Sequence, residues 1–407
     1  MNFKKDTGLQ PTLRIQLDQD ASTHWFRPGD KICGYLEVDT LGPPLPPITL
    51  AGIYLIGRSK TKVNEARGQT GTHDYRDRID LFRRDRDLRG SRDETRHRDD
   101  PIQRFPFTLR FPDATDPHPE DKVKHLFNRA IPNPLPPTLP RVEHYGYRQK
   151  GYGYISYRLT AFLQAHDSSQ LPSSVDPPLD LEAIAEVNLN PLVRENLNEI
   201  NPEWDPRPAT APLRTVFETF TRSSSALLPA TNSSSSSSRP STLRETLHDK
   251  LSFHTPKAVF AIYLTLPERF ALNLPLPPCT LRLEYDGKKS TCTSPPDVEI
   301  QHLSWGLLSL TQCSAPGTLH LIKTPVPFTE QADVFLPMNW GQEIDLAAMC
   351  GLQACAEGSL VPTFESFSVI RVYEWRTEVG VLCGGKVFKA EFKMDVRVLP
   401  PVQGLGG

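Results

Sequence analysis

Two alternating segments near the C-terminal end of the chain, separated by a pair of glycines, constrain the fold most strongly. From Phe388 to Val398 every second residue is apolar, and the residues between them are charged. This period of two is typical of a β-strand with one face on a core and one in water. The preceding segment, 369–383, is also strand-like, and Gly384-Gly385 can take the positive φ angles of a primed two-residue turn. The pattern predicts a β-hairpin.

The N-terminal half begins with a turn that leads directly into a strand of the same kind. Pro28 sets φ for the second position of a turn, and Gly29 can take the positive φ that a type II turn needs next. Apolar residues and Gly34 then alternate over 32–38. Further strands are expected at 13–17, 48–56, 105–111, 155–163, 258–266, 280–285, 298–310 and 318–322.

Proline accounts for 40 of the 407 residues, about twice its usual share of roughly 5%. Because proline interrupts helices and central strands, elements should be short and loops long. A Ser- and Pro-rich stretch separates two runs of strands. We therefore expect an all-β chain of two immunoglobulin-like β-sandwich domains, at 1–190 and 255–400, joined by a flexible low-complexity linker at 191–254. Weak structure is expected at 179–187, and a short helix at 241–251.

A charged segment at about 60–104 is expected as an insertion in the first domain. Between Asp74 and Asp100 it contains nine basic and nine acidic side chains. One interpretation is a solvated, partly helical or disordered surface. The other is an anion- or partner-binding arm that uses Arg83, Arg84 and Arg86, although the interleaved aspartates give each arginine a local counter-charge.

The linker contains a run of six serines. One interpretation is a plain flexible connection, and the other is phosphorylation that changes partner choice. The candidate phosphoacceptors are Ser233, Ser234, Ser235, Ser236, Ser237 and Ser238.

Sites of chemistry are hard to find in the sequence. There is no nucleophile elbow, phosphate-binding loop, zinc motif or dinucleotide fingerprint, so we expect no catalytic, cofactor or metal residues and no enzyme. His302, His320 and Cys383 are expected to be packed or surface residues.

The proline-rich 43–47 segment is a rigid loop or an SH3-type ligand. The formal net charge of −2 gives no case for nucleic acid as a partner. No signal peptide or membrane span is expected, and the seven cysteines are interpreted as reduced thiols of an intracellular protein.

These elements, in this order, resemble the arrestin family, most closely the fungal alpha-arrestin relatives. The resemblance also includes strand 48–57 and the Leu-Pro-Pro-Thr segment at 135–138. The residues that match the family's fold signature are Pro28, Gly29, Asp30, Gly34, Phe105, Phe107, Tyr157, Pro362, Phe364, Tyr373, Gly384 and Gly385.

The resemblance implies a non-enzymatic cytoplasmic adaptor that links membrane transporters or receptors to trafficking or ubiquitination machinery, recruited to the plasma membrane or endosomes through its partners. Family members typically recruit a ubiquitin ligase through Pro-Pro-x-Tyr motifs. None of the Pro-Pro pairs in this chain has Tyr two residues after it. The alternative is therefore a protein-binding β-sandwich module that has lost ligase recruitment.

Overall fold

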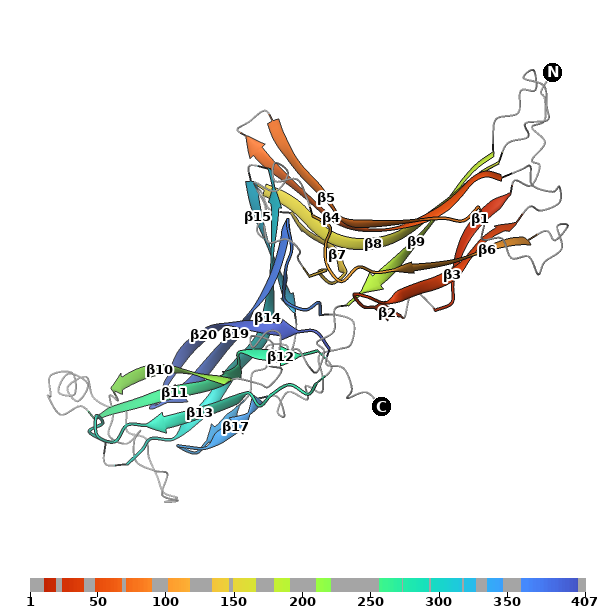
Figure 1. Ribbon diagram of the computed structural model, residues 1–407. Helices are drawn as coiled ribbons and strands as arrows, with labels where there is room; N and C mark the ends of the chain where they lie inside the picture. The colour runs from red at the N-terminus through yellow and green to blue at the C-terminus, as the bar shows by residue number, and fades with distance from the viewer. Residues whose placement is uncertain are drawn as a thin grey trace, which may run out of the picture. The chain divides into compact units, whose positions relative to one another are not determined.

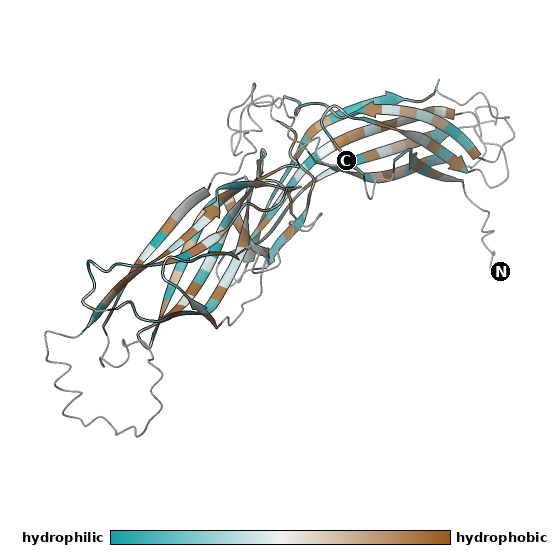
Figure 2. Ribbon diagram, turned by 90° about the horizontal axis from the view of Figure 1, so that it is seen from below, coloured by the Kyte–Doolittle hydropathy of each residue, from teal (hydrophilic) through white to brown (hydrophobic). Residues whose placement is uncertain are grey.

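All the elements that the structure describes are β-strands, arranged in four sheets (Figure 1). A computed structural model describes residues 11–19, 24–39, 48–67, 71–89, 102–117, 134–145, 149–165, 179–190, 210–220, 256–272, 274–292, 294–316, 318–326, 335–346 and 360–401. Apolar and polar residues alternate along many strands, as Figure 2 shows. The prediction of an all-β chain is confirmed, and every predicted strand segment overlaps an observed strand.

The chain divides into two compact units. Unit 1 comprises Met1–Leu192, Thr311–Ile322 and Phe364–Arg371, and unit 2 comprises Val193–Leu310, Lys323–Thr363 and Val372–Gly407. Unit 1 contains a three-stranded sheet in the order β1-β3-β6 and a six-stranded sheet in the order β2-β9-β8-β4-β5, with β7 also pairing with β8. The strands are β1 (Thr12–Leu17), β2 (Trp25–Phe26), β3 (Lys31–Asp39), β4 (Ile48–Arg67), β5 (Gly71–Asp87), β6 (Ile102–Arg110), β7 (Leu139–Tyr145), β8 (Gln149–Ala165) and β9 (Leu179–Leu189).

The predicted turn before β3 is present and is stabilised from both sides. Gly29 has φ of 84°, and Asp30 N–H donates to the Arg27 carbonyl at 3.0 Å, as a type II turn requires. The Asp30 carboxylate accepts a return bond from Arg27 N–H at 2.9 Å. Gly29 N–H donates to the Phe111 carbonyl, and Phe111 N–H to the Asp30 carbonyl. The turn is thereby fastened to the end of β6.

Gly34 is required because β1 passes close to β3. Gly34 pairs with Leu17. A Cβ at Gly34 would overlap the carbonyl oxygen of Gln16 and lie 3.0 Å from the Leu17 Cα. Because both obstacles are backbone atoms, no side-chain rotation relieves the clash, so β1 can pair here only with glycine opposite it.

Aromatic rings join the two sheets of unit 1. Phe105 and Phe107 on β6 are buried, and Phe111 just after β6 is fully buried. The Phe111 ring contacts Phe82 of β5 and Tyr157 of β8, with centroids 6.0 and 5.6 Å apart. Edge-to-face pairs of this kind add to the stabilisation from burial. The core of unit 1 therefore lies between the β6 side and the β4–β5–β8 sheet.

Two segments from the second half of the chain pack against β4 and β8 within unit 1. Buried hydroxyl groups make the contacts: Ser59 Oγ lies 2.8 Å from Ser368 Oγ, and Thr61 Oγ1 donates to the Ser314 carbonyl at 2.6 Å. Gly153 makes the close approach possible, because a Cβ there would overlap Cys313 Sγ.

Unit 2 contains a four-stranded sheet and most of a seven-stranded one. The orders are β10-β11-β13-β17 and β12-β20-β19-β14-β15, with β16 paired to β14 and β18 to β19. The seven-stranded sheet is shared between the units: β14, β15 and β19 also contribute residues to unit 1, and β18 lies wholly within unit 1. The strands are β10 (Thr210–Phe220), β11 (Lys257–Pro267), β12 (Arg269–Ala271), β13 (Thr280–Tyr285), β14 (Val298–Ala315), β15 (Thr318–Val326), β16 (Leu336–Met338), β17 (Glu343–Asp345), β18 (Phe364–Glu365), β19 (Val369–Cys383) and β20 (Lys386–Leu399).

The C-terminal hairpin forms as predicted. β19 and β20 pair from Tyr373↔Val396 to Cys383↔Lys386, and Gly384 and Gly385 have φ of 57° and 73°. Two successive positive φ values are those of a type I′ turn, whose twist matches that of the strands it joins.

A set of hydrogen bonds in unit 1, which we call the Tyr–Thr lock, fastens the 135–138 segment to the sheet. The Tyr157 hydroxyl donates to the Pro136 carbonyl at 2.6 Å. Thr138 N–H donates to the Leu189 carbonyl, and Leu189 N–H donates back to Thr138 Oγ1, both at 2.8 Å. Leu189 also pairs in parallel with Phe26 of β2.

Unit 2 contains the same lock at equivalent positions. The Tyr373 hydroxyl donates to the Val361 carbonyl. Thr363 N–H donates to the Val398 carbonyl at 2.8 Å, and Val398 N–H donates back to Thr363 Oγ1 at 2.9 Å. Val398 pairs in parallel with Phe270 of β12. In each unit the tyrosine bonds the carbonyl two residues before the threonine, so the two units repeat one local arrangement.

Three sequence expectations were wrong where the structure describes the residues. Much of the charged segment is regular strand, in β4 up to Arg67, in β5 and at the start of β6. Its outward charges pair both across strands, as Arg58 does with Asp80 at 2.6 Å, and along β5, as Arg83 does with Asp85 at 2.8 Å, so polar composition did not prevent sheet formation. β9 is a full strand paired with β8, where only weak structure was expected. β10 lies inside the predicted linker and pairs with β11, because Leu213, Thr215 and Phe217 alternate toward the sheet. The expected helix at 241–251 and the proline-rich 43–47 loop lie outside the described residues.

Candidate functional site

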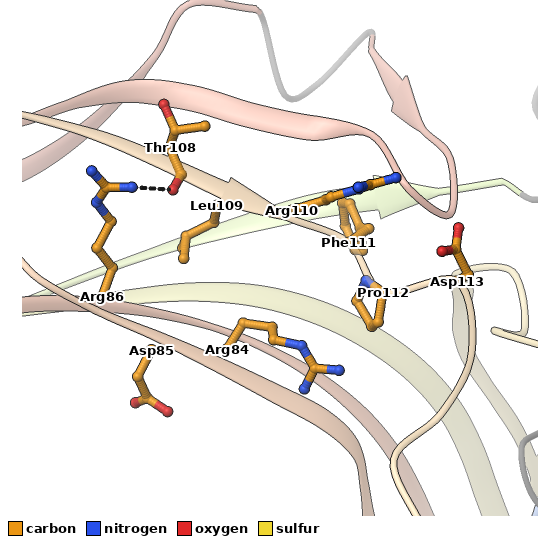
Figure 3. Close-up of a pocket in the computed structure, with 9 residues that line it drawn as sticks. All are labelled: Arg84, Asp85, Arg86, Thr108, Leu109, Arg110, Phe111, Pro112 and Asp113. Atoms are coloured by element: carbon orange, nitrogen blue, oxygen red, sulfur yellow. Dashed lines mark hydrogen bonds between the residues drawn. The ribbon is translucent and has the colours of Figure 1, made fainter.

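The alternation of β5 sorts its mixed charges onto two sides of the strand. Arg84 and Arg86 point toward β6, whereas Asp85 points away, as Figure 3 shows. Arg83 shares the outer side with Asp85: its Nη2 lies 2.8 Å from Asp85 Oδ1, and this hydrogen bond raises the pKa of Arg83. Arg83 also lies over the Tyr54 ring, 4.2 Å from its centroid. Residues that are adjacent in sequence therefore lie on opposite sides of the strand, and Arg84 and Arg86 lie on the inner side, away from Asp85.

The inner arginines line a groove between the edges of two sheets. β5 ends the order of the six-stranded sheet, and β6 ends that of the three-stranded sheet. The groove has a volume of about 500 Å³. Its lining residues, drawn in Figure 3, are Arg84, Asp85, Arg86, Thr108, Leu109, Arg110, Phe111, Pro112 and Asp113. The groove thus combines three guanidinium groups with the apolar side chains of Leu109, Phe111 and Pro112.

The strand registers show which backbone groups face the groove. Phe111 N–H bonds the Asp30 carbonyl, and alternation along β6 then directs the backbone groups of Thr108 and Arg110 away from β3. Leu88 N–H bonds the Ala51 carbonyl, which by the same rule directs those of Asp85 away from β4. Pro106 also stands at an outward position of β6, where its missing N–H costs no ladder bond.

The three arginines of the groove differ in their partners. Arg84 makes a two-point ion pair with Asp116, with both N–O distances 2.8 Å, and this hydrogen bonding raises its pKa. Arg86 donates to the Thr108 carbonyl at 3.1 Å, and Arg110 donates through Nε to the Gly29 carbonyl at 2.8 Å. Over the ranges that the structure describes, neither Arg86 nor Arg110 forms an ion pair. Both present guanidinium charge to the groove with only neutral carbonyl partners.

The fold-signature residues have structural roles around this groove and elsewhere. The Pro28-Gly29-Asp30 turn closes one end, since the Gly29 carbonyl accepts the Arg110 bond. Gly34 permits the close pairing of β1 and β3. The others lie in the core, in β18, in the two locks and in the final turn: Phe105, Phe107, Tyr157, Pro362, Phe364, Tyr373, Gly384 and Gly385. The candidate phosphoacceptors Ser233–Ser238 lie outside the described residues.

A second, smaller hollow of about 400 Å³ lies among β4, β5, β7 and β8. Its lining includes Lys62, Arg141, Glu143 and Tyr152. Arg141 lies over the Tyr152 ring at 4.0 Å from its centroid and pairs with Glu143, while Lys62 pairs with Asp74 at 3.1 Å. Two of the three cations that line this hollow, Lys62 and Arg141, thus have aromatic or carboxylate partners, and Lys150 is the third.

Of the titratable residues singled out in the sequence, Cys383 and His320 are packed in the interior, and His302 is half-buried with Nε2 3.8 Å from Glu378 Oε1. Burial raises the pKa of the Cys383 thiol to about 12, the reverse of what an activated nucleophile needs. His320 is buried with Nδ1 at 2.9 Å from Gln149 Oε1, and burial, with a smaller effect from His144, lowers its pKa. Among the described residues, no group of three or more His, Cys, Asp or Glu side chains is arranged to hold a metal ion.

No helix in the described part of the chain is long and apolar enough to cross a membrane.

Arg110 and Asp116 were missed in the sequence. Arg110 is a single charge at the end of an apolar strand, and only the approach of β6 to β5 brings it into one groove with Arg84 and Arg86. The alternation of Arg84, Asp85, Arg86 and Asp87 does contain a signal, because strand periodicity would have placed the arginines together.

No protein-family model matches the chain, and no curated protein sequence matches it either.

Proposed function

We propose that this protein is a non-enzymatic, arrestin-like adaptor that binds partner proteins through the surface of unit 1. The observation that carries this proposal is the arginine-lined groove between the two sheet edges. Edge strands with outward backbone groups are a recurring surface for recognising extended protein segments. The order of sequence motifs, from the Pro28 turn to the Gly384 hairpin, supports an arrestin-type sandwich for each unit, and the repeated Tyr–Thr lock is in keeping with it.

The proposed partners are membrane transporters or receptors on one side and trafficking or ubiquitination machinery on the other. The adaptor would act in the cytoplasm and reach the plasma membrane or endosomes through its partners. Affinity capture of the full-length protein from its native cell tests this. Specific recovery of membrane proteins together with trafficking or ubiquitin-pathway components supports the proposal, and recovery of neither class contradicts it.

A second candidate function is favoured because no Pro-Pro pair in the chain is followed by Tyr at the second position after the pair, as a Pro-Pro-x-Tyr motif requires. In this alternative the protein binds partners but does not recruit a ubiquitin ligase of the WW-domain class directly. A pull-down with purified WW domains separates the two. Under the alternative, the WW domains do not bind this protein. Saturable binding of a WW domain that is lost when its binding segment is deleted from this chain eliminates the alternative.

A further inference from the structure

We propose that two copies of this chain associate through β20, which pairs antiparallel with β20 of the second copy and joins the two seven-stranded sheets edge to edge. The inference goes beyond the proposed function and does not rest on it. Three features of unit 2 support it: an open edge along β20, backbone groups directed out from that edge, and a charge pattern that is complementary to itself.

The outer edge of β20 is open over most of its length. β20, drawn in blue in Figure 1, pairs with β19 on one side. On its other side, among the described strands, only β12 pairs with it, and that pairing is limited to Arg397–Leu399. The stretch 386–396 therefore ends the described sheet. Such an edge is a template for pairing with a further strand.

Alternation along β20 shows which backbone groups lie on this edge. Arg397 N–H donates to the Glu268 carbonyl at 2.8 Å, and the Leu399 carbonyl accepts a bond from Leu272 N–H. Both partners belong to the β12 side, so residues at odd positions direct their N–H and C=O groups away from β19. The backbone groups of 387, 389, 391, 393 and 395 therefore point outward, where a second antiparallel strand would bond them.

The side chains at these odd positions alternate in charge, and they are exposed: Lys389, Glu391, Lys393 and Asp395. Lysines on an edge strand discourage pairing when a second copy brings like charge opposite them. Alternating signs have the opposite effect, because opposite charges can meet when the strand pairs antiparallel with itself. The charge pattern of β20 therefore favours a second copy of the same strand as its partner.

The length of the open edge selects one register. With Ala390 on the twofold axis, the stretch 385–395 of one copy lies along the same stretch of the other. Lys389 then faces Glu391 of the second copy, and Glu391 faces the second copy's Lys389. The turn of the second copy reaches only as far as Val396, one residue before the pairing with β12 begins.

Neighbouring registers fit less well. With the axis one residue later, like charges would oppose each other, Glu391 facing itself and Lys389 facing Lys393 of the second copy. With the axis two residues later, the second strand would reach Arg397, whose backbone N–H already bonds the Glu268 carbonyl. Axes earlier than Ala390 shorten the paired stretch.

Sedimentation velocity of the purified full-length protein between about 1 and about 100 µM tests the inference. We expect a reversible equilibrium between monomer and dimer. Hydrogen exchange measured at the two ends of this range should be slower at the higher concentration in peptides from β20, because the outward amides of 387–395 are bonded by the second copy only in the dimer.

Charge reversals locate the interface and its register. Lys389→Glu and Glu391→Lys should each weaken self-association at least about tenfold, because like charges then face each other on both sides of the axis. An equimolar mixture of the two variants should restore dimers, since opposite charges meet again, and a merely misfolded variant could not be rescued in this way. Lys393→Glu, the same charge change on the same strand, is the matched control and should alter self-association less than about threefold.

A protein that stays monomeric at about 100 µM overturns the inference. So does a dimer that Lys389→Glu and Glu391→Lys leave unchanged, or one whose concentration-dependent protection lies outside β20. Failure of the mixed variants to form dimers, or a larger effect of Lys393→Glu than of Lys389→Glu, contradicts the assigned pairing and overturns it as well.

Discussion

Replacing Tyr157 by Phe removes one hydroxyl and should measurably destabilise unit 1. Tyr157 is 1% exposed, and its hydroxyl donates to the Pro136 carbonyl at 2.6 Å in the interior. The phenyl ring can keep its contacts with Phe82 and Phe111, so packing is preserved. What is lost is the partner of a buried carbonyl, which costs about 1–3 kcal/mol.

The same argument applies to Tyr373→Phe, because the lock of unit 2 has equivalent bonds. Urea denaturation of the full-length variants gives the change in unfolding free energy, and hydrogen exchange of peptides from β8–β9 and β19–β20 assigns it to a unit. We expect each variant to accelerate exchange mainly in its own unit. In a thermal scan, 1 kcal/mol corresponds to about 2–4 °C in Tm for a unit of this size.

Tyr154→Phe is the matched control. Tyr154 lies on the same strand but on the outer side and is only half-buried, so we expect a change within about 0.5 kcal/mol. If Tyr157→Phe also changes the unfolding free energy by no more than the control does, the lock does not stabilise the sheet and the reasoning is refuted.

Three further predictions concern close packing, pH and thiol access. Gly34→Ala should lower the free energy of unfolding in urea by about 3 kcal/mol, because the new Cβ overlaps the β1 backbone. Gly71→Ala, with nothing within 4 Å of the new Cβ, should leave it unchanged, and equal effects of the two substitutions would contradict the close approach of β1 to Gly34. Burial lowers the pKa of His320 below 6.5, so below about pH 6.5 the unfolded chain binds a proton that the folded chain does not, and the free energy of unfolding decreases as the pH is lowered. If a His320→Gln variant shows the same dependence of the unfolding free energy on pH, His320 is excluded as its cause. Iodoacetamide should modify the half-buried Cys33 well before Cys383, because Cys383 is 0% exposed and its pKa is raised to about 12. The opposite order of modification in peptide mapping would show that the end of β19 opens.

Much of the fold could be predicted because its signals are local. Alternation identified the strands, and the two turns were predictable because positive φ at Gly29 and at Gly384-Gly385 needs residues without a Cβ. The charged segment was misjudged because composition says nothing about cross-strand pairing. β5 carries charge on both sides, yet its outward charges find partners on the neighbouring strand, as Asp80 does in Arg58, or on β5 itself, as Arg83 does in Asp85.

The candidate site was only half predictable. Arg84 and Arg86 were noticed in the sequence. Their separation from the neighbouring aspartates follows from alternation along a strand, and the sequence predicted a partly helical or disordered segment there. The place of Arg110 depended on how β6 approaches β5, which no local pattern specifies. The repeated lock had a visible signal, since Leu-Pro-Pro-Thr at 135–138 and Leu-Val-Pro-Thr at 360–363 match in three of four positions. Their equivalence became apparent only through the bonds to Leu189 and Val398.

Proximity labelling in the native cell tests the central claim most directly, namely that this protein is an adaptor whose partners bind the β5–β6 groove. The wild-type chain, an Arg86→Gln/Arg110→Gln double variant and the Arg83→Gln control would each carry the labelling enzyme and be expressed at equal levels. The account predicts that the wild type and the control label the same membrane and trafficking proteins, and that the double variant loses a defined subset of them. Identical neighbours for all three chains, or the absence of membrane and trafficking proteins from every sample, would contradict it.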